Sequence, residues 1–192
     1  MPFHGPISGT IEAAWVLFLF YWFVMAFRVK RTVKRQSLAG RARHILLGVV
    51  AFLLLFDNRI AWGVLAAPLV PAAWAWAVAG AALTWAGVGL AIWARTILGS
   101  NWSGLVTLKQ NHTLIRSGPY SVVRHPIYSG LLLAGLGTAL ALGEARGFLA
   151  VAVVFLLWLE KSRTEERFMI EQFGREYEEY RQRTWALVPF VL

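Results

Sequence analysis

Cysteine is absent from the 192 residues of this sequence. Its absence excludes disulfide bonds, thiolate-ligated zinc and a cysteine nucleophile, and it leaves the redox compartment undetermined. Histidine is scarce as well: His4, His44, His112 and His125 do not cluster and lack the helical spacing of metal ligands. The sequence therefore predicts no metal site.

Acidic residues are few, with 10 Asp and Glu against 19 Lys and Arg, and the formal net charge is +9. A basic protein can bind nucleic acid, but these cations flank apolar runs and do not alternate with aromatic residues on a soluble face. Hydrophobic residues make up 58% of the chain, including 10 Trp and 12 Phe, which is more than a soluble domain needs. The composition predicts an integral membrane protein whose partners include membrane lipids and no nucleic acid.

The apolar runs predict an all-α fold, with about five transmembrane helices in a single domain covering residues 1–192. The first run lacks a small-residue cleavage site, so it is expected to be a retained span and not a signal peptide. A helix over 160–183 is expected to continue from the last span out of the membrane. The expected spans lie near residues 11–27, 41–57, 72–98, 128–143 and 147–159.

Basic residues concentrate in alternate connections between these spans. Segments 28–43, 95–127 and 160–192 hold seven, four and six Lys or Arg, whereas only Arg59 and Arg146 fall on the opposite side. The positive-inside rule then predicts an extracytosolic N-terminus and a cytosolic C-terminus. The leading interpretation is a multi-pass protein of a bacterial inner membrane or its equivalent, and the oligomeric state is left open.

The most polar stretch between the spans runs from His112 to Gly130. Proline is well suited to the first position of a helix, so Pro126 predicts a loop that leads into a helix N-terminus. Such an end attracts anions, with Arg124 and His125 beside it, while tyrosine rings can face an organic cation. Two alternatives stay open: the tyrosines are interfacial anchors, or His125 only caps the helix.

Two motifs in this sequence resemble the signature of isoprenylcysteine carboxyl methyltransferases. The first has the form His-x-Leu-x-x-Ser-Gly-x-Tyr at 112–120, followed by Arg-His-Pro-x-Tyr-x-Gly at 124–130. The second comprises Glu165-Glu166, then Phe173-Gly174, two tyrosines and a late Pro-Phe. The resemblance covers roughly residues 87–192 and implies methyl transfer from S-adenosylmethionine to a lipophilic acceptor, most simply the carboxylate of a prenylcysteine-like or other lipid-tailed molecule.

The resemblance also implies roles for individual residues. Lys161 and Arg163 are the candidates for orienting the acceptor carboxylate, and Glu166 is a further catalytic candidate. One departure concerns Arg183-Thr184-Trp185, where the family commonly has Arg-Val-Pro, in the region expected to shape the acceptor tunnel. The implied cofactor contacts are His112, Thr113, Leu114, Ile115, Tyr120, His125, Pro126, Ile127, Tyr128 and Glu165.

Two other functions remain open at this point. Gly87-Val88-Gly89 ahead of Leu98-Gly99 resembles the glycine pair of phospholipid N-methyltransferases, although Gly-x-Gly within a span usually serves helix packing. A non-catalytic membrane scaffold or binding protein is the alternative from another class. The same packing rule predicts that Gly135, Ala139 and Gly143, spaced four residues apart, form a face that a neighbouring helix approaches closely.

Overall fold

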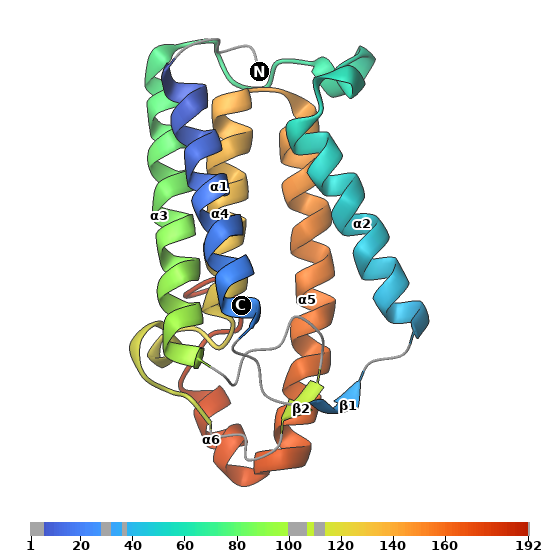
Figure 1. The fold of residues 1–192 in the computed structure, drawn as a ribbon, viewed down its shortest axis with the longest axis vertical. Helices are drawn as coiled ribbons and strands as arrows, with labels where there is room; N and C mark the ends of the chain where they lie inside the picture. Colours follow the sequence, from blue (N-terminus) through green and yellow to red (C-terminus); the bar gives the residue numbers. More distant parts are fainter. Residues whose placement is uncertain (1–5, 28–31, 36–37, 100–106, 110–113, 192) are drawn as a thin grey trace.

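The computed structural model describes residues 6–27, 32–35, 38–99, 107–109 and 114–191. Within these ranges, five long helices run alternately in opposite directions along a common axis (Figure 1). They are α1 (Pro6–Ala26), α2 (Leu38–Phe56), α3 (Trp74–Leu98), α4 (Pro126–Leu142) and α5 (Ala145–Phe173). The short helix α6 (Arg175–Gln182) follows α5, and single 3-10 turns lie in the connections: η1 (Asn58–Ile60), η2 (Gly63–Ala66) and η4 (Gly118–Ser121).

Helices α3 and α4 form the most closely packed pair in the bundle. A Cβ on Gly137 would lie 2.5 Å from the carbonyl oxygen of Gly80, and a Cβ on Gly130 would lie 2.6 Å from that of Gly87. Glycine is therefore required at both crossings, because any side chain would push the two backbones apart. The packing interpretation of Gly87 is thus sufficient for that residue, and the phospholipid N-methyltransferase hypothesis gains nothing from it.

The predicted small-residue face of α4 points mainly toward α5. A Cβ on Gly135 would lie 3.6 Å from Val151, and Ala139 is completely buried, 3.0 Å from the position of a Cβ on Gly147. Gly143 differs, because it ends α4 with a positive φ of 73° and faces Val70. The expected close approach is confirmed for Gly135 and Ala139, while Gly143 serves as the helix C-cap.

The outer helices α1 and α2 expose large apolar side chains, among them Phe20, Phe23, Ile45 and Leu46. Two described helices, Ile7–Ala26 and Trp74–Leu98, are long and apolar enough to cross a bilayer. The apolar segments Ala42–Phe56 and Pro126–Leu142 are shorter. These features support a location in a membrane, and the prediction of five spans remains a prediction.

The last helix departs from its prediction in one detail. The last span does continue as a helix beyond residue 159, as expected, but residues 160–183 do not form one helix, because α5 ends at Phe173 and Gly174, with φ 52° and ψ −128°, separates it from α6. The all-α fold class is confirmed, and the described strands form one short pair: β1 (Thr32–Arg35) pairs antiparallel with β2 (Thr107–Lys109). Strands of three or four residues are too short for an alternating pattern to be recognised.

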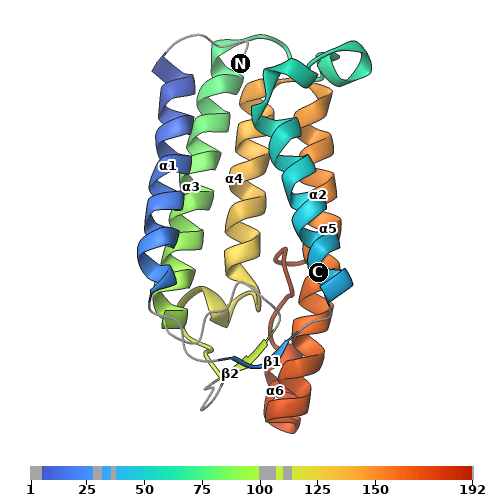
Figure 2. The ribbon, with the colours of Figure 1, turned by 45° about the vertical axis from the view of Figure 1, so that its right-hand side comes forward.

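The strands, α6 and the loop that precedes α4 gather at one end of the bundle (Figure 2). The described parts of the three basic segments therefore share this end, as their alternation between spans predicts. Arg95 departs from that pattern, because its side chain is fully buried and donates to the carbonyl oxygens of Met25 and Gly99. It joins the last turns of α1 and α3 and is not a loop cation.

Candidate functional site

The loop before α4 is held against α3 by a glycine turn. Gly118 opens the turn η4 with φ 60°, a conformation that favours glycine. Pro126 occupies the first position of α4 and His125 is its N-cap residue, as predicted, but the His125 side chain makes no capping hydrogen bond. The alternative that His125 only caps the helix is therefore wrong, and its imidazole is available for other contacts.

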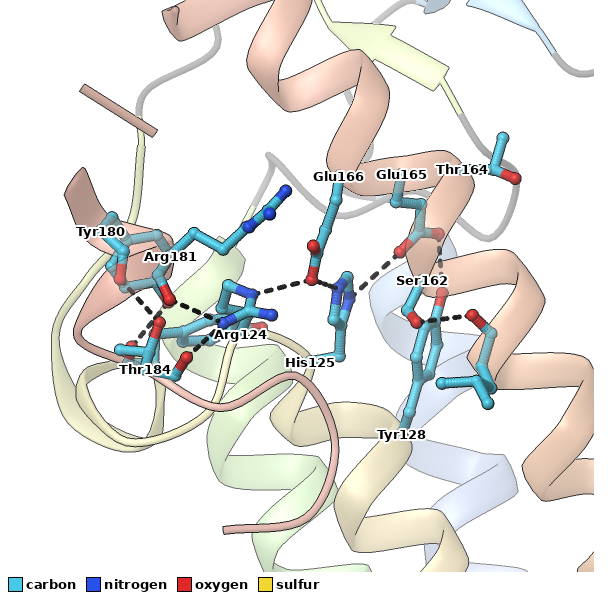
Figure 3. Close-up of polar contacts among 12 residues, drawn as sticks. Arg124, His125, Tyr128, Ser162, Thr164, Glu165, Glu166, Tyr180, Arg181 and Thr184 are labelled. Atoms are coloured by element: carbon cyan, nitrogen blue, oxygen red, sulfur yellow. Dashed lines mark hydrogen bonds and ion pairs between the residues drawn. The ribbon is translucent and has the colours of Figure 1, made fainter. Parts of the chain in front are cut away.

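The imidazole of His125 lies between Glu165 and Glu166 of α5 (Figure 3). Its Nδ1 is 3.3 Å from Oε2 of Glu165, and its Nε2 is 3.3 Å from Oε1 of Glu166. The hydroxyl of Tyr128 donates to Oε1 of Glu165 at 2.7 Å. Residues that are about forty positions apart in the sequence thus form one polar cluster, which we call the histidine–glutamate cluster (His125, Tyr128, Glu165 and Glu166).

Burial and charge act in opposite directions on the three titratable groups of this cluster that lie beyond the spans. Burial alone would lower the pKa of His125, but its hydrogen bonds and attraction to Glu165 and Glu166 outweigh burial, and the net pKa is raised. Burial would raise the pKa of Glu165 and Glu166, but His125 lowers both, helped by Lys161 at Glu165 and by Arg124 at Glu166. The ionised forms of all three groups are therefore favoured in the folded protein.

An aromatic stack connects the cluster to the interior of the bundle. The rings of His125 and Tyr128 are 5.5 Å apart and nearly parallel, at 2°, and Tyr128 stacks in turn on Trp158 at 5.3 Å and 15°. The Nζ of Lys161 lies 5.3 Å from the centroid of the Tyr128 ring. Trp158 was not predicted to belong to the site. The sequence feature that indicates it is its position three residues before Lys161, on the same helix face.

Arg124 links the loop to two other elements. Its Nε donates to Oε1 of Glu166 at 2.7 Å, and its Nη1 donates to the carbonyl oxygens of Arg181 and Thr184. From the sequence, Arg124 is expected only to be a cation near a helix end. In the structure, its charge is divided between a carboxylate of α5 and two carbonyl groups of the C-terminal segment, so it orients Glu166 toward His125.

The segment Thr184–Leu187 lies along the loop and forms a short parallel pairing with it. Arg124 N donates to Trp185 O at 2.8 Å, His125 N donates to Ala186 O at 3.1 Å, and Trp185 N donates to Val122 O at 3.1 Å. Leu187 is completely buried. Thr184 and Trp185, the departure from the family pattern, thus contact the loop that carries His125 through their backbones, which is a role that the acceptor-tunnel expectation did not include.

The remaining predicted site residues fall into four groups. His112 and Thr113 lie outside the described residues. Ile115, Tyr120 and Ile127 pack together against Ala94, and Tyr120 is 6% exposed. Leu114 is half-buried, and Pro126 is fully buried beneath the loop. Of the two candidate acceptor-orienting cations, Lys161 faces Tyr128, whereas Arg163 is exposed to solvent.

Burial also affects two tyrosines near the cluster. It raises the pKa of Tyr120, which therefore stays neutral, and Tyr180 donates its hydroxyl to the Tyr120 carbonyl oxygen at 2.6 Å. Burial raises the pKa of Tyr180 to about 12. The interfacial-anchor alternative is wrong for Tyr120, because that side chain packs inside the protein and does not face the membrane surface.

An apolar cavity of about 740 Å³ runs between α1, α2, α4 and α5 and ends beside the cluster. Lys161 and Trp158 line one end of it, next to Tyr128. Trp15 and Phe56 line the opposite end, with their rings 5.7 Å apart in an edge-to-face contact. The cavity therefore joins the polar cluster at one end of the bundle to the apolar interior.

Comparison with known proteins places these features in a family. Over 96 residues the chain is 36% identical to protein-S-isoprenylcysteine O-methyltransferase B of Arabidopsis thaliana, covering 48% of this chain and 49% of that protein. It is 41% identical over 95 residues to the cobalt-zinc-cadmium resistance protein CzcN of Cupriavidus metallidurans, covering 48% and 43%. The alignments thus span about half the length of these curated relatives.

The fold is also similar to that of a solved structure, the eukaryotic intramembrane Ras methyltransferase (isoprenylcysteine carboxyl methyltransferase), with a TM-score of 0.61 at 24% identity. The match covers 78% of this chain and 53% of that one. Residues 75–176 match the phospholipid methyltransferase family. They include all of α3 except Trp74, all of α4 and the four residues of the histidine–glutamate cluster. This chain belongs to the phospholipid methyltransferase family.

Proposed function

We propose that the protein transfers a methyl group from S-adenosylmethionine to the head group of a lipophilic acceptor, most simply a carboxylate. The observation that carries the proposal is the position of the histidine–glutamate cluster at one end of an apolar cavity of about 740 Å³. A polar cluster alone would fit many functions, and an apolar cavity alone would fit a lipid-binding protein. Their junction at Lys161 and Tyr128 suits a molecule with one polar and one apolar end.

The residues of the cluster fit the chemistry of S-adenosylmethionine. When bound, this cofactor would supply an activated methyl group on a sulfonium sulfur. Glu165 is a buried carboxylate that can pair with a cation, and the ring of Tyr128 offers a face for a second positive centre. His125 occupies Glu165 in the described structure, so a bound cation would replace one charged partner of Glu165 by another.

The acceptor side of the proposal rests on Lys161. Its ammonium lies at the end of the cavity, over Tyr128, where it can pair with an anionic head group. A carboxylate is already ionised at neutral pH, so its oxygen can form the new O–C bond, while the C–S bond breaks, without a general base. The contribution of the protein is then alignment and exclusion of water, which supplies on the order of several kcal/mol.

We further propose that the acceptor enters from the bilayer and that the cluster faces the cytosol. An apolar tail contributes about 0.8 kcal/mol per buried methylene to membrane partitioning, which concentrates a dilute acceptor beside the cavity. The shared end of the three basic segments supports this orientation. A topology reporter fused after Leu192 is expected to be active only in its cytosolic form, and extracytosolic activity would contradict the orientation.

The proposal is tested with purified protein in detergent, methyl-labelled S-adenosylmethionine and lipid-tailed acceptors that share one tail and differ in the head group. Carboxylate acceptors are expected to be labelled. Lys161→Gln is expected to raise KM for them by roughly tenfold, the worth of one charge-assisted contact, whereas Arg163→Gln, an exposed matched control, changes it little.

The head-group series also separates the alternatives. Labelling of amine-headed lipids alone would replace the present proposal with phospholipid N-methylation. Failure to bind S-adenosylmethionine would favour the scaffold alternative. Equal effects of Lys161→Gln and Arg163→Gln would remove Lys161 from the acceptor site.

A further inference from the structure

The end of the apolar cavity opposite Lys161 is defined by aromatic side chains. Trp15 of α1 lies edge-to-face on Phe56, the last residue of α2, with ring centroids 5.7 Å apart, and on Phe18 at 5.8 Å. All three side chains line the cavity. On the α5 wall, the cavity extends from Lys161 to Ala150, which corresponds to about 16 Å along the helix axis.

The indole of Trp15 is fixed by a hydrogen bond inside the bundle. Its Nε1 donates to Oγ1 of Thr138 on α4 at 3.0 Å. Thr138 is 1% exposed, and its hydroxyl donates to the carbonyl oxygen of Ala134 at 2.9 Å. A ring that is hydrogen-bonded to a buried hydroxyl and packed against Phe18 and Phe56 has little freedom to move aside, so the far end of the cavity is rigid.

We propose that Trp15, held by Thr138 and in contact with Phe56, narrows the far end of the cavity and limits the length of the acceptor tail that the protein accepts. This inference rests on the proposed function, in which the tail of the acceptor occupies this cavity. The occupant is one hydrocarbon chain: the length of about 16 Å is close to half of a bilayer hydrocarbon core of about 30 Å, the reach of a single lipid chain. At the end of the cavity opposite Trp15, the ammonium of Lys161 complements an anionic head group.

The geometry also defines what the removal of Trp15 would do. Glu12 lines the cavity about one helical turn beyond Trp15 on α1. Replacement of the indole by a methyl group would remove the constriction, so that a hydrocarbon chain could extend to the wall at Glu12, about 5 Å or one turn of helix further on. A tail that is too long for the wild-type cavity would then fit.

The experiment measures tail length directly and does not require turnover. Single-chain carboxylates of increasing length are added to purified protein without methyl donor, and the rise in thermal stability is recorded for each length. Wild type is expected to show a cut-off beyond which longer chains stabilise less. One excess methylene that does not fit an apolar pocket costs at least about tenfold in affinity. Trp15→Ala is expected to move this cut-off to longer chains.

Matched variants separate the proposed role from a general effect on packing. Leu17→Ala changes an exposed residue of the same helix that does not line the cavity, and it is expected to leave the cut-off unchanged. Thr138→Val removes the hydrogen-bond acceptor of Trp15 and is expected to make the decline of stabilisation with chain length less sharp. Thr138→Ser keeps the hydroxyl and is expected to keep the sharp cut-off of wild type.

The outcomes distinguish this inference from the proposed function. A wild-type protein that binds all chain lengths equally, or a Trp15→Ala variant that binds S-adenosylmethionine normally and keeps the wild-type cut-off, would overturn the role of Trp15. Loss of methyl transfer to every acceptor, with the cut-off and its shift intact, would instead overturn the proposed reaction and leave the length limit in place.

Discussion

Two buried polar clusters lie at opposite ends of the helical bundle, and they differ in how their charges are partnered. At the end that contains η1, the guanidinium of Arg146 is 1% exposed and donates to Glu144 at 2.6 Å, to Asn58 at 2.9 Å and to the carbonyl oxygens of Leu54 and Asp57. At the other end, two glutamates share one histidine at 3.3 Å on each side.

The difference shows which kind of buried charge is suited to bind a ligand. The guanidinium of Arg146 is a single cation among fixed acceptors of α2, its following turn and the start of α5, and this arrangement suits a structural role. Glu165 lies one helical turn after Lys161, which lines the cavity, and it is contacted by His125 and Tyr128, which are partners that a bound cation can replace or join. Burial of charge alone therefore does not distinguish the two ends, and the proposed function rests on the apolar cavity that begins next to Glu165 at Lys161.

The largest effect is expected when the polar cluster around Arg146 is disrupted. Arg146→Ala leaves Glu144 and two carbonyl groups without their buried cation, and removal of one partner of such a cluster typically costs about 3–5 kcal/mol of unfolding free energy. Chemical denaturation in detergent measures it. The protein that remains folded is expected to bind S-adenosylmethionine with unchanged affinity. A loss of less than about 1 kcal/mol, or a selective loss of cofactor binding, would contradict the structural role.

A smaller effect is expected at the histidine–glutamate cluster. Glu165→Gln keeps the shape of the side chain and removes its charge, so it is expected to weaken binding of S-adenosylmethionine by about 1.5–3 kcal/mol, the worth of a charge-assisted contact. Calorimetry in detergent measures the affinity. Glu160→Gln is the control, because Glu160 lies on the same helix and its exposed carboxylate pairs with Arg43. Equal affinity in wild type and Glu165→Gln would remove Glu165 from the cofactor site.

Much of the fold was accessible from the sequence because helix boundaries depend on local signals. Pro126 begins α4 as its fixed backbone angle predicts, and the third apolar run coincides with α3 (Trp74–Leu98). The continuation of the last span as a helix beyond residue 159 was also predicted, whereas its end at Phe173 was not, because a single glycine such as Gly174 does not by itself end a helical pattern. The burial of Arg95 and Arg146 could not be predicted, because a cation near a span end usually reaches water.

For the site, the sequence identified most of the participants but not their arrangement. The motifs named His125, Tyr128, Glu165 and Lys161, which the structure brings together. The placement of His125 between both glutamates depends on the angle at which α5 passes α4, which no local pattern encodes. The pairing of Trp185 with the loop depends on the turn at Gly174 and on α6, and so it required the three-dimensional structure.

The smallest expected effect concerns the proton that His125 shares with its two carboxylates. His125→Gln keeps a hydrogen-bond donor but removes the titratable group, and it is expected to lower the unfolding free energy by about 1 kcal/mol where the imidazole is charged. Thermal unfolding of both proteins across the pH range measures the difference. In Arg146→Ala, by contrast, the loss of stability is expected to vary little over the same range, because arginine stays charged throughout.

The direction of the pH dependence follows from the raised pKa of His125. Its ordinary value is 6.5, and a higher pKa in the folded state means that the protonated imidazole stabilises the fold. This contribution is fully present below pH 6.5 and disappears as the pH rises through the higher folded value. The lowered pKa values of Glu165 and Glu166 act in the opposite sense, since their contribution is present above the ordinary value of 4.5 and disappears as the pH falls through the folded values.

The stability difference between wild type and His125→Gln is therefore expected to be largest between pH 4.5 and 6.5 and to decline at higher pH. A difference that increases above pH 7 would mean that His125 is neutral between the two glutamates, and the cluster would then resemble the fixed network around Arg146 more than an exchangeable ion pair.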